Sequence, residues 1–167
     1  MLNQTGIPGA ADLRKVLPSE ERMLQGPVAI IECFQEIPCN PCTEACKQGA
    51  ILPMQDINDL PKMAFEKCNG CGLCISRCPG LAIFIVDFSY RPTEAVVRIP
   101  YEFVPLPEAG QKVMGLNRAG EVLGTFEVKK VQSGGKKNMT YTIWLVVPRE
   151  LAMEVRNIRL GGDKHGA

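Results

Sequence analysis

The residues of this chain best suited to chemistry are eight cysteines, all of which fall between positions 33 and 78. Four of them occur in the stretch CNGCGLCISRCPG, separated by two, two and three residues and followed directly by a proline. Thiolates are soft ligands, and thiolates packed this closely along a chain typically bind zinc or an iron–sulfur cluster. The spacing therefore predicts a metal centre built on residues 68–80.

An even number of cysteines also suits a disulfide framework in a small secreted protein. The first residues, MLNQTGIPGAADLRK, lack the charged and then apolar layout of a secretory signal. No apolar run approaches the ~20 residues of a membrane span. We therefore expect a cytoplasmic protein, in which thiols stay reduced and are available as metal ligands.

The two groups of cysteines form an internal repeat. When the sequence is shifted by 32 residues, the last three cysteines of the first group fall on the last three of the second. The groups differ only at their start, because Cys33 precedes the next cysteine by six positions and Cys68 by three. Each half has an apolar approach, a cysteine loop and an apolar exit, which indicates a duplicated unit.

The run C-x2-C-x2-C-x3-C-P over residues 68–79 is the ligand pattern of bacterial ferredoxins. Thiolates that recur every third residue in a tight loop can reach three corners of a cubane [4Fe–4S] cluster. Gly70 and Gly72 are expected to let the loop curl. The fourth cysteine of the run points away and binds the cluster of the other repeat, which accounts for a second group upstream.

Residues 28–88 resemble the two-cluster, bacterial-type ferredoxins, with CNGCGLCISRCPG as the most specific signature. The resemblance implies two [4Fe–4S] clusters, with cluster I on Cys33, Cys39, Cys42 and Cys78 and cluster II on Cys68, Cys71, Cys74 and Cys46. The first group departs from the family pattern twice, because Cys33 is displaced and because Lys47 stands where proline is usual. Without Cys33 as a ligand, cluster I would be a three-iron centre.

Zinc is the alternative occupant of these thiols. The pairs Cys39/Cys42 and Cys71/Cys74 form the C-x2-C…C-x2-C frame of a tetrahedral zinc site. Zinc would use four of the eight cysteines, whereas two clusters use all of them. The ligand count therefore favours iron–sulfur clusters.

The pattern of the first half predicts an α+β protein that begins with a lead-in segment over residues 1–27. Ser19 marks the start of a short helix in this segment. The two-cluster domain follows over residues 28–88, and its first element is a strand over 28–34, because VAIIECF is β-branched and apolar.

From residue 89 the pattern changes to strands separated by glycine-rich turns, which predicts a small β-rich, barrel-like domain over residues 89–160. Its strands are expected over 95–104, 112–117, 121–131 and 141–147. A C-terminal helix is expected over 148–158, with Pro148 at its start, and residues 161–167 are expected to be a disordered tail.

No candidate catalytic residue accompanies the cysteines. The sequence contains neither of the glycine-rich dinucleotide or phosphate motifs, and its only histidine, His165, is two residues from the end. We therefore expect a non-catalytic electron-transfer subunit that depends on partners. A net charge of +1 differs from that of strongly acidic, freely diffusing carriers and favours a protein held in a complex.

A narrower resemblance rests on the segments IECFQEIPCNPCTEACKQGAI, CPGLAIFIVD, VPLPEAGQKVMGLNRAGEVLG and VPRELAMEVRNIR. They are similar to the small ferredoxin-like subunits of bacterial flavin-dependent amine or amino-acid dehydrogenase complexes. The resemblance implies a hetero-oligomeric oxidoreductase complex with FAD only on partner subunits and with a further small iron–sulfur subunit. The substrate, the direction of electron flow, the terminal acceptor, the stoichiometry and the cluster potentials stay open.

Two other functions are compatible with the sequence. The pairs Lys129–Lys130 and Lys136–Lys137, near Tyr141 and Trp144, suit a zinc- or cluster-bearing protein that binds nucleic acid. Lysines beside a turn are usually solvated, however, so we expect docking to a flavoprotein and no nucleic acid. A free soluble ferredoxin is the other alternative and would be a monomer.

Overall fold

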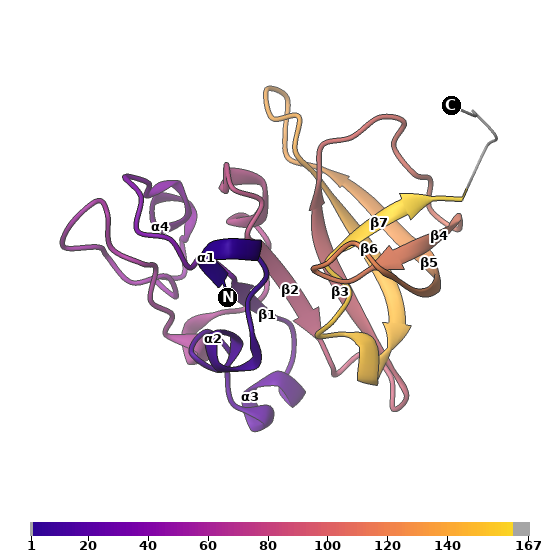
Figure 1. The fold of residues 1–167 in the computed structure, drawn as a ribbon, viewed down its shortest axis with the longest axis horizontal. Helices are drawn as coiled ribbons and strands as arrows, with labels where there is room; N and C mark the ends of the chain where they lie inside the picture. Colours follow the sequence, from indigo (N-terminus) through magenta and orange to yellow (C-terminus); the bar gives the residue numbers. More distant parts are fainter. Residues whose placement is uncertain (1, 162–167) are drawn as a thin grey trace.

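The computed structural model describes residues 2–161. The fold is α+β and is built on one open, seven-stranded antiparallel sheet with the order β1-β2-β3-β6-β5-β4-β7. Helices α1 to α4 and the cysteine loops lie on one side of β1 and β2, and the other strands lie on the opposite side (Figure 1). The strands are β1 Val28–Ile31, β2 Ile83–Asp87, β3 Glu94–Tyr101, β4 Lys112–Leu116, β5 Val122–Ser133, β6 Tyr141–Pro148 and β7 Asn157–Leu160.

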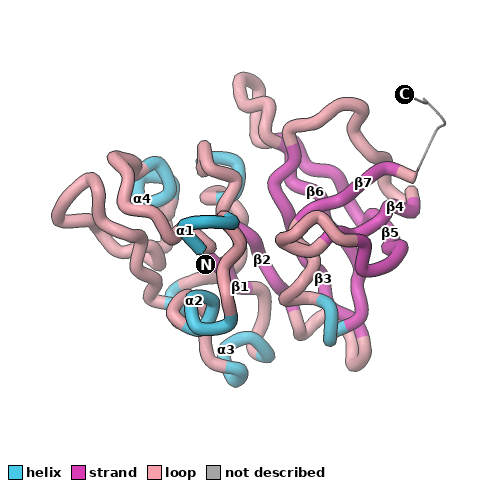
Figure 2. Tube along the Cα trace, viewed as in Figure 1, coloured by secondary structure: helices cyan, strands magenta, loops and turns pink. Residues whose placement is uncertain are grey.

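The helices are short, and loops make up most of the first half of the chain (Figure 2). The expected helix after Ser19 is confirmed, because Ser19 Oγ accepts a hydrogen bond of 3.2 Å from the backbone N–H of Arg22 and so caps α3. No helix among residues 2–161 is long and apolar enough to cross a membrane. The helices are α1 Leu2–Thr5, α2 Ala10–Arg14, α3 Glu20–Leu24, α4 Pro41–Ala45, and the 3-10 helices η1 Phe65–Lys67, η2 Ile75–Arg77 and η3 Arg149–Leu151.

Strands β1 and β2 form the wall between two hydrophobic cores. Successive side chains of a strand point to opposite faces. On β2, Ile83 and Ile85 pack among the cysteines, while Phe84 and Val86 pack into the core of the second half. β1 and β2 pair in antiparallel register, with Ala29 opposite Ile85. Both strands therefore direct one face toward the cysteines and the other face toward the core of the second half. The cysteine loops are therefore packed onto a rigid sheet.

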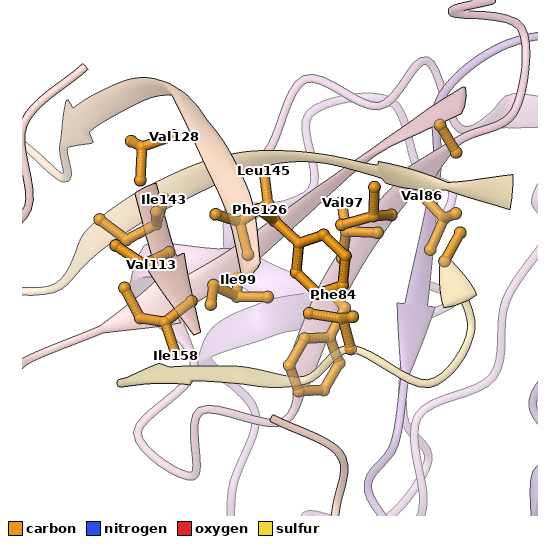
Figure 3. Packing of buried hydrophobic residues seen from close by; sticks show 14 of the residues in the cluster. Phe84, Val86, Val97, Ile99, Val113, Phe126, Val128, Ile143, Leu145 and Ile158 are labelled. Carbon is orange, nitrogen blue, oxygen red and sulfur yellow. The ribbon is translucent and has the colours of Figure 1, made fainter. Parts of the chain in front are cut away.

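The core of the second half lies between the strands that curl around it (Figure 3). Burial of an isoleucine, leucine, valine or phenylalanine side chain contributes about 1.5–3 kcal/mol. This core therefore stabilises the sheet on which the cysteine loops rest. Its members with the lowest exposure include Val97, Ile99, Val113, Val128, Ile143 and Leu145.

The sheet continues across the expected boundary at residue 88. Strand β2 pairs with β3 in antiparallel register, with Ile85 opposite Arg98 and Asp87 opposite Val96. The division into two domains stays a prediction, since both parts share one sheet. The barrel-like closure also stays a prediction, because β7 approaches β3 without a hydrogen-bonded register among the described residues.

The expectation of a C-terminal helix over 148–158 is wrong. The 3-10 helix η3 and one hydrogen-bonded turn over residues 151–155 form after Pro148. The chain then extends into β7, which pairs with β4 so that Gly115 lies opposite Ile158. Ala152 and Val155 are fully buried against the sheet core. Pairing with the open edge of β4 therefore outweighs the local helical pattern. Apart from Gly161, the expected disordered tail lies outside the described residues, as does His165.

Candidate metal centres

Four thiols line one cavity on the cysteine side of the sheet, and they belong to Cys46, Cys68, Cys71 and Cys74. The cavity holds about 330 Å³ of space between atoms, part of it open to solvent. Three of the thiols come from one loop, and Cys46 comes from the end of α4 in the other repeat. Apolar residues complete the walls, including Ala29, Ile51, Met63, Leu73 and Ile85.

A second cavity, of about 380 Å³, is lined by Cys33, Cys39, Cys42 and Cys78. Here the first repeat contributes three thiols and the second repeat contributes Cys78. The structure thus brings all eight cysteines together as two groups of four, each with one member from the other repeat. Other residues of this wall are Ile31, Ile37, Met54, Asp59, Pro61 and Ile83.

The arrangement of the thiols fits a polynuclear cluster. Zinc draws its sulfur ligands to about 2.3 Å from a single point. The eight thiols instead line two cavities in groups of four, and a cubane has four irons that each take one thiolate.

Two glycines allow the loop of residues 68–74 to wrap around its cavity. Gly70 and Gly72 have φ angles of 66° and 87°, in the region that favours glycine. A Cβ atom at Gly70 would lie 2.5 Å from Cβ of Pro27, which is far inside van der Waals contact. The loop therefore packs directly against the residue that precedes β1.

Backbone amides donate hydrogen bonds to three of the sulfurs. The N–H groups of Ala29, Ile51 and Ala82 lie 3.4 Å from Sγ of Cys68, Cys46 and Cys78, respectively. Such bonds stabilise negative charge on a thiolate and raise the reduction potential of a bound cluster. Two of the three sulfurs, Cys46 and Cys78, are those that cross to the other repeat's cavity.

Burial raises the pKa of three of these thiols. Burial, followed by the charges of the neighbouring Cys68 and Cys71, raises the pKa of the Cys74 thiol to about 12. Burial likewise raises the pKa of Cys33 and of Cys42 above the ordinary value. A thiol must lose its proton to bind a metal. Binding of iron in either cavity would therefore release protons, and the positive charge of the iron would balance the negative charge of the thiolates.

Two arginines from outside the cysteine motif hold the loop of residues 68–74 at its start. Arg22 donates a hydrogen bond of 2.5 Å from Nη2 to the carbonyl of Cys68, and Arg98 donates one of 2.6 Å from Nη1 to the carbonyl of Gly70. Arg98 is buried, and its guanidinium lies 3.7 Å from the ring centroid of Trp144. Burial lowers the pKa of Arg98, but an arginine stays charged in proteins.

A buried charge network lies behind Cys33. Glu32 accepts hydrogen bonds of 2.7 and 2.8 Å from Arg118 and one of 2.8 Å from Arg156. Burial tends to raise the pKa of Glu32, but the hydrogen bonds and charges of the two arginines outweigh it and hold that pKa below its ordinary value. The network links the strand that leads to Cys33 with the second half of the chain.

Comparisons with known proteins agree with this chemistry. A family model described as "4Fe-4S binding domain" matches residues 62–84, which contain the second group of cysteines. The "Ferredoxin-type protein NapF" of Escherichia coli strain K12 is 33% identical over 52 residues, which is 30% of this chain and 32% of that protein. The proteins of the same name from E. coli O6:H1 (strain CFT073) and O157:H7 match to the same extent.

The matched region and the thiol-lined cavities together support a ferredoxin-type 4Fe-4S protein. They support iron–sulfur electron transfer as its class of function. The chain spans about a third of the length of the curated relatives that it matches. No solved structure matches it.

Sequence reasoning missed the polar residues that hold the cysteine loops. Most of these residues lie far along the chain from the group that they contact, so no local motif identifies them. One signal was present in the sequence, because Arg98 interrupts the apolar run AVVRIPY and a charge inside a buried strand calls for a specific partner. The missed residues are Arg22, Glu32, Arg98, Arg118, Asn138 and Arg156.

Proposed function

We propose that this chain is an electron-transfer subunit that holds two [4Fe–4S] clusters. The ligands of cluster I are Cys33, Cys39, Cys42 and Cys78, and those of cluster II are Cys68, Cys71, Cys74 and Cys46. The observation that supports this assignment is the grouping of the eight thiols around two cavities, each with one thiol from the other repeat. Bound clusters of this type accept and release single electrons.

The residues around each cavity suit such a role. Apolar side chains limit the access of water, and backbone N–H groups directed at the sulfurs stabilise the added negative charge. Shared packing against β1 and β2 keeps the two cavities in one rigid unit. A rigid frame suits electron transfer because little has to move when the charge changes.

The partner in this proposal is a flavin subunit of an amine or amino-acid dehydrogenase complex. The assignment rests on the resemblance of the whole chain to the small subunits of such complexes. FAD belongs to the partner, the assembly is a hetero-oligomer with a further small iron–sulfur subunit, and its location is cytoplasmic. In this arrangement the β-rich half serves as a docking module for the flavoprotein.

A nucleic-acid-binding role finds less support. Binding of single strands relies on aromatic rings that are free to stack on bases. The ring of Trp144 has Arg98 at 3.7 Å and Lys130 at 5.0 Å from its centroid, so other side chains already cover it. Tyr90 is similarly flanked by Arg91 and Lys129.

The experiment that tests the partner is anaerobic purification of the tagged chain from the cells that make it. We expect a flavoprotein at a stoichiometric ratio, with FAD found in the eluate and an amine or amino acid able to reduce the clusters through it. Purification as a monomer that transfers electrons to several unrelated acceptors would instead identify a free ferredoxin. Recovery of nucleic acid in place of flavin would contradict the proposal.

A further inference from the structure

Two hollows lie next to each other on the surface beside the cysteine loops. One hollow lies along α4 and η2, and the other lies between η2 and the loop that connects β5 to β6. Both are bordered by Pro41 and Arg77, so they are adjacent. The connecting loop stands at the top of Figure 1, above the end of the sheet. We call the two hollows together the basic groove.

The basic groove has an excess of positive charge. Its cationic residues are Lys47 and Arg77 in the cysteine half and Lys136 and Lys137 in the β5–β6 loop, and all four are exposed. Its acidic residues are Glu44 and Glu102, and Glu102 is hydrogen-bonded to Thr140. The four cations and two anions leave a net charge of +2 on this surface.

The β5–β6 loop is fixed in place against the cysteine loop. Asn138 donates a hydrogen bond of 2.5 Å from Nδ2 to the carbonyl of Ser76, which lies midway between Cys74 and Cys78. A Cβ atom at Gly134 would lie 2.9 Å from Cβ of Ser76 and 2.6 Å from the carbonyl oxygen of Thr140. The lysines of this loop are therefore held beside the cluster ligands.

A single apolar residue separates the basic groove from the cavity of cluster II. Leu73 lines both the groove and that cavity, and its side chain is 46% exposed. Cys71, a ligand of cluster II in the proposed function, is exposed at the same loop. A protein bound in the groove would thus contact a residue that also forms the wall of the cluster II cavity. Met139, which is 76% exposed, adds an apolar contact at the other end of the groove.

We propose that the basic groove is the docking site at which an acidic protein surface exchanges electrons with cluster II. This inference rests on the proposed function. Complementary charge steers the encounter and orients the partner, while Leu73 and Met139 supply apolar contact. One electron leaves reduced cluster II and reduces the acceptor by one electron, and the reverse transfer uses the same contact.

Charge reversal in the β5–β6 loop provides the test. The variant Lys136→Glu/Lys137→Glu changes exposed residues, whereas the control variant Lys15→Glu/Lys62→Glu makes the same change of net charge at exposed sites outside the groove. The reduced, cluster-loaded full chain is mixed in a stopped-flow instrument with a flavodoxin, a small acidic flavoprotein. Parallel reactions use anionic ferricyanide and cationic hexaamminecobalt(III), each of which takes up one electron.

We expect electron transfer to flavodoxin and to ferricyanide to slow by at least about fivefold at low salt in the groove variant. Reaction with the cobalt complex should speed up, and the control variant should stay near the wild type with all three acceptors. Equal rates for the groove and control variants would overturn the docking site. A different outcome is that the wild type and the control variant bind a single-stranded oligonucleotide that the groove variant does not bind. That result would overturn the docking site and identify a nucleic-acid site.

Iron and sulfide are counted in each sample before mixing. A chain that is purified without clusters overturns the proposed function and this inference with it. A fully loaded chain whose rates do not respond to the groove variant overturns the docking site alone.

Discussion

Arg98 Nη1 donates a hydrogen bond of 2.6 Å to the carbonyl oxygen of Gly70, and this bond ties strand β3 to the loop that provides three ligands of the proposed cluster II. The guanidinium is buried beneath Trp144 and close to Cys71 and Cys68. The β-rich half therefore contributes a positive charge to the environment of the cluster as well as a surface for packing.

Replacement of Arg98 by methionine should lower the midpoint potential of cluster II. A nearby buried cation stabilises the more negative, reduced state, so its removal should shift the potential down by on the order of tens of mV. Arg98→Lys keeps the charge and should stay closer to the wild type. Redox titration followed by electron paramagnetic resonance measures both shifts, and equal potentials in the wild type and Arg98→Met would contradict this role.

Substitution of Gly70 by alanine should impair retention of cluster II. The φ angle of 66° alone costs a non-glycine residue about 1–2 kcal/mol, and contact with Pro27 adds to this. Gly49→Ala is a matched control, because Gly49 has a φ angle of 62° and open space around its Cβ position. The rate at which the cluster absorbance is lost on warming should rise much more for Gly70→Ala than for Gly49→Ala. Similar rates for the two variants would show that Pro27 does not restrict the loop.

Replacement of Glu32 by glutamine should strongly destabilise the fold. Arg156 would remain buried without its paired carboxylate, and Arg118 would keep the contact of 3.5 Å to the exposed Glu154. Loss of one partner of a buried ion pair typically costs about 3–5 kcal/mol. For a chain of this size the apparent Tm, followed by circular dichroism, should fall by about 10 °C. The control Glu154→Gln removes a contact of 3.5 Å to Arg118 from a side chain that is 52% exposed, and it should cost at most about 0.5 kcal/mol. Comparable losses of Tm in the two variants would argue against a special role for the buried network.

Replacement of Cys33 by serine should convert cluster I into a three-iron centre while cluster II stays intact. Cys33 is displaced in the sequence relative to the first cysteine of the second group, yet it lines the same cavity as Cys39, Cys42 and Cys78. Iron analysis should then show a loss of about one iron per chain. The oxidised protein should acquire the paramagnetic signal of a three-iron cluster. A full complement of iron without that signal would show that Cys33 is not a ligand.

The sequence predicted the chemistry better than the architecture. Cysteine spacing, β-branched runs and a helix-capping serine are patterns of neighbouring residues. They predicted the two cysteine groups, most strands and the start of α3 at Ser19. Patterns of neighbouring residues could not predict that one sheet runs through both halves of the chain. The pairing of β2 with β3 depends on burial of one face of β2 against the cysteines and of the other face in the core of the second half. Likewise, Arg22 meets Cys68 across 46 positions, and Asn138 meets Ser76 across 62. The misplaced C-terminal helix has the same cause, since the open edge of β4 lies about 40 residues earlier in the chain.

Counts of iron and acid-labile sulfide in the anaerobically purified chain will show whether the eight thiols hold two four-iron clusters. We expect close to eight of each per chain, with negligible zinc. About four of each would leave only one cluster, and zinc without sulfide would rule out both clusters.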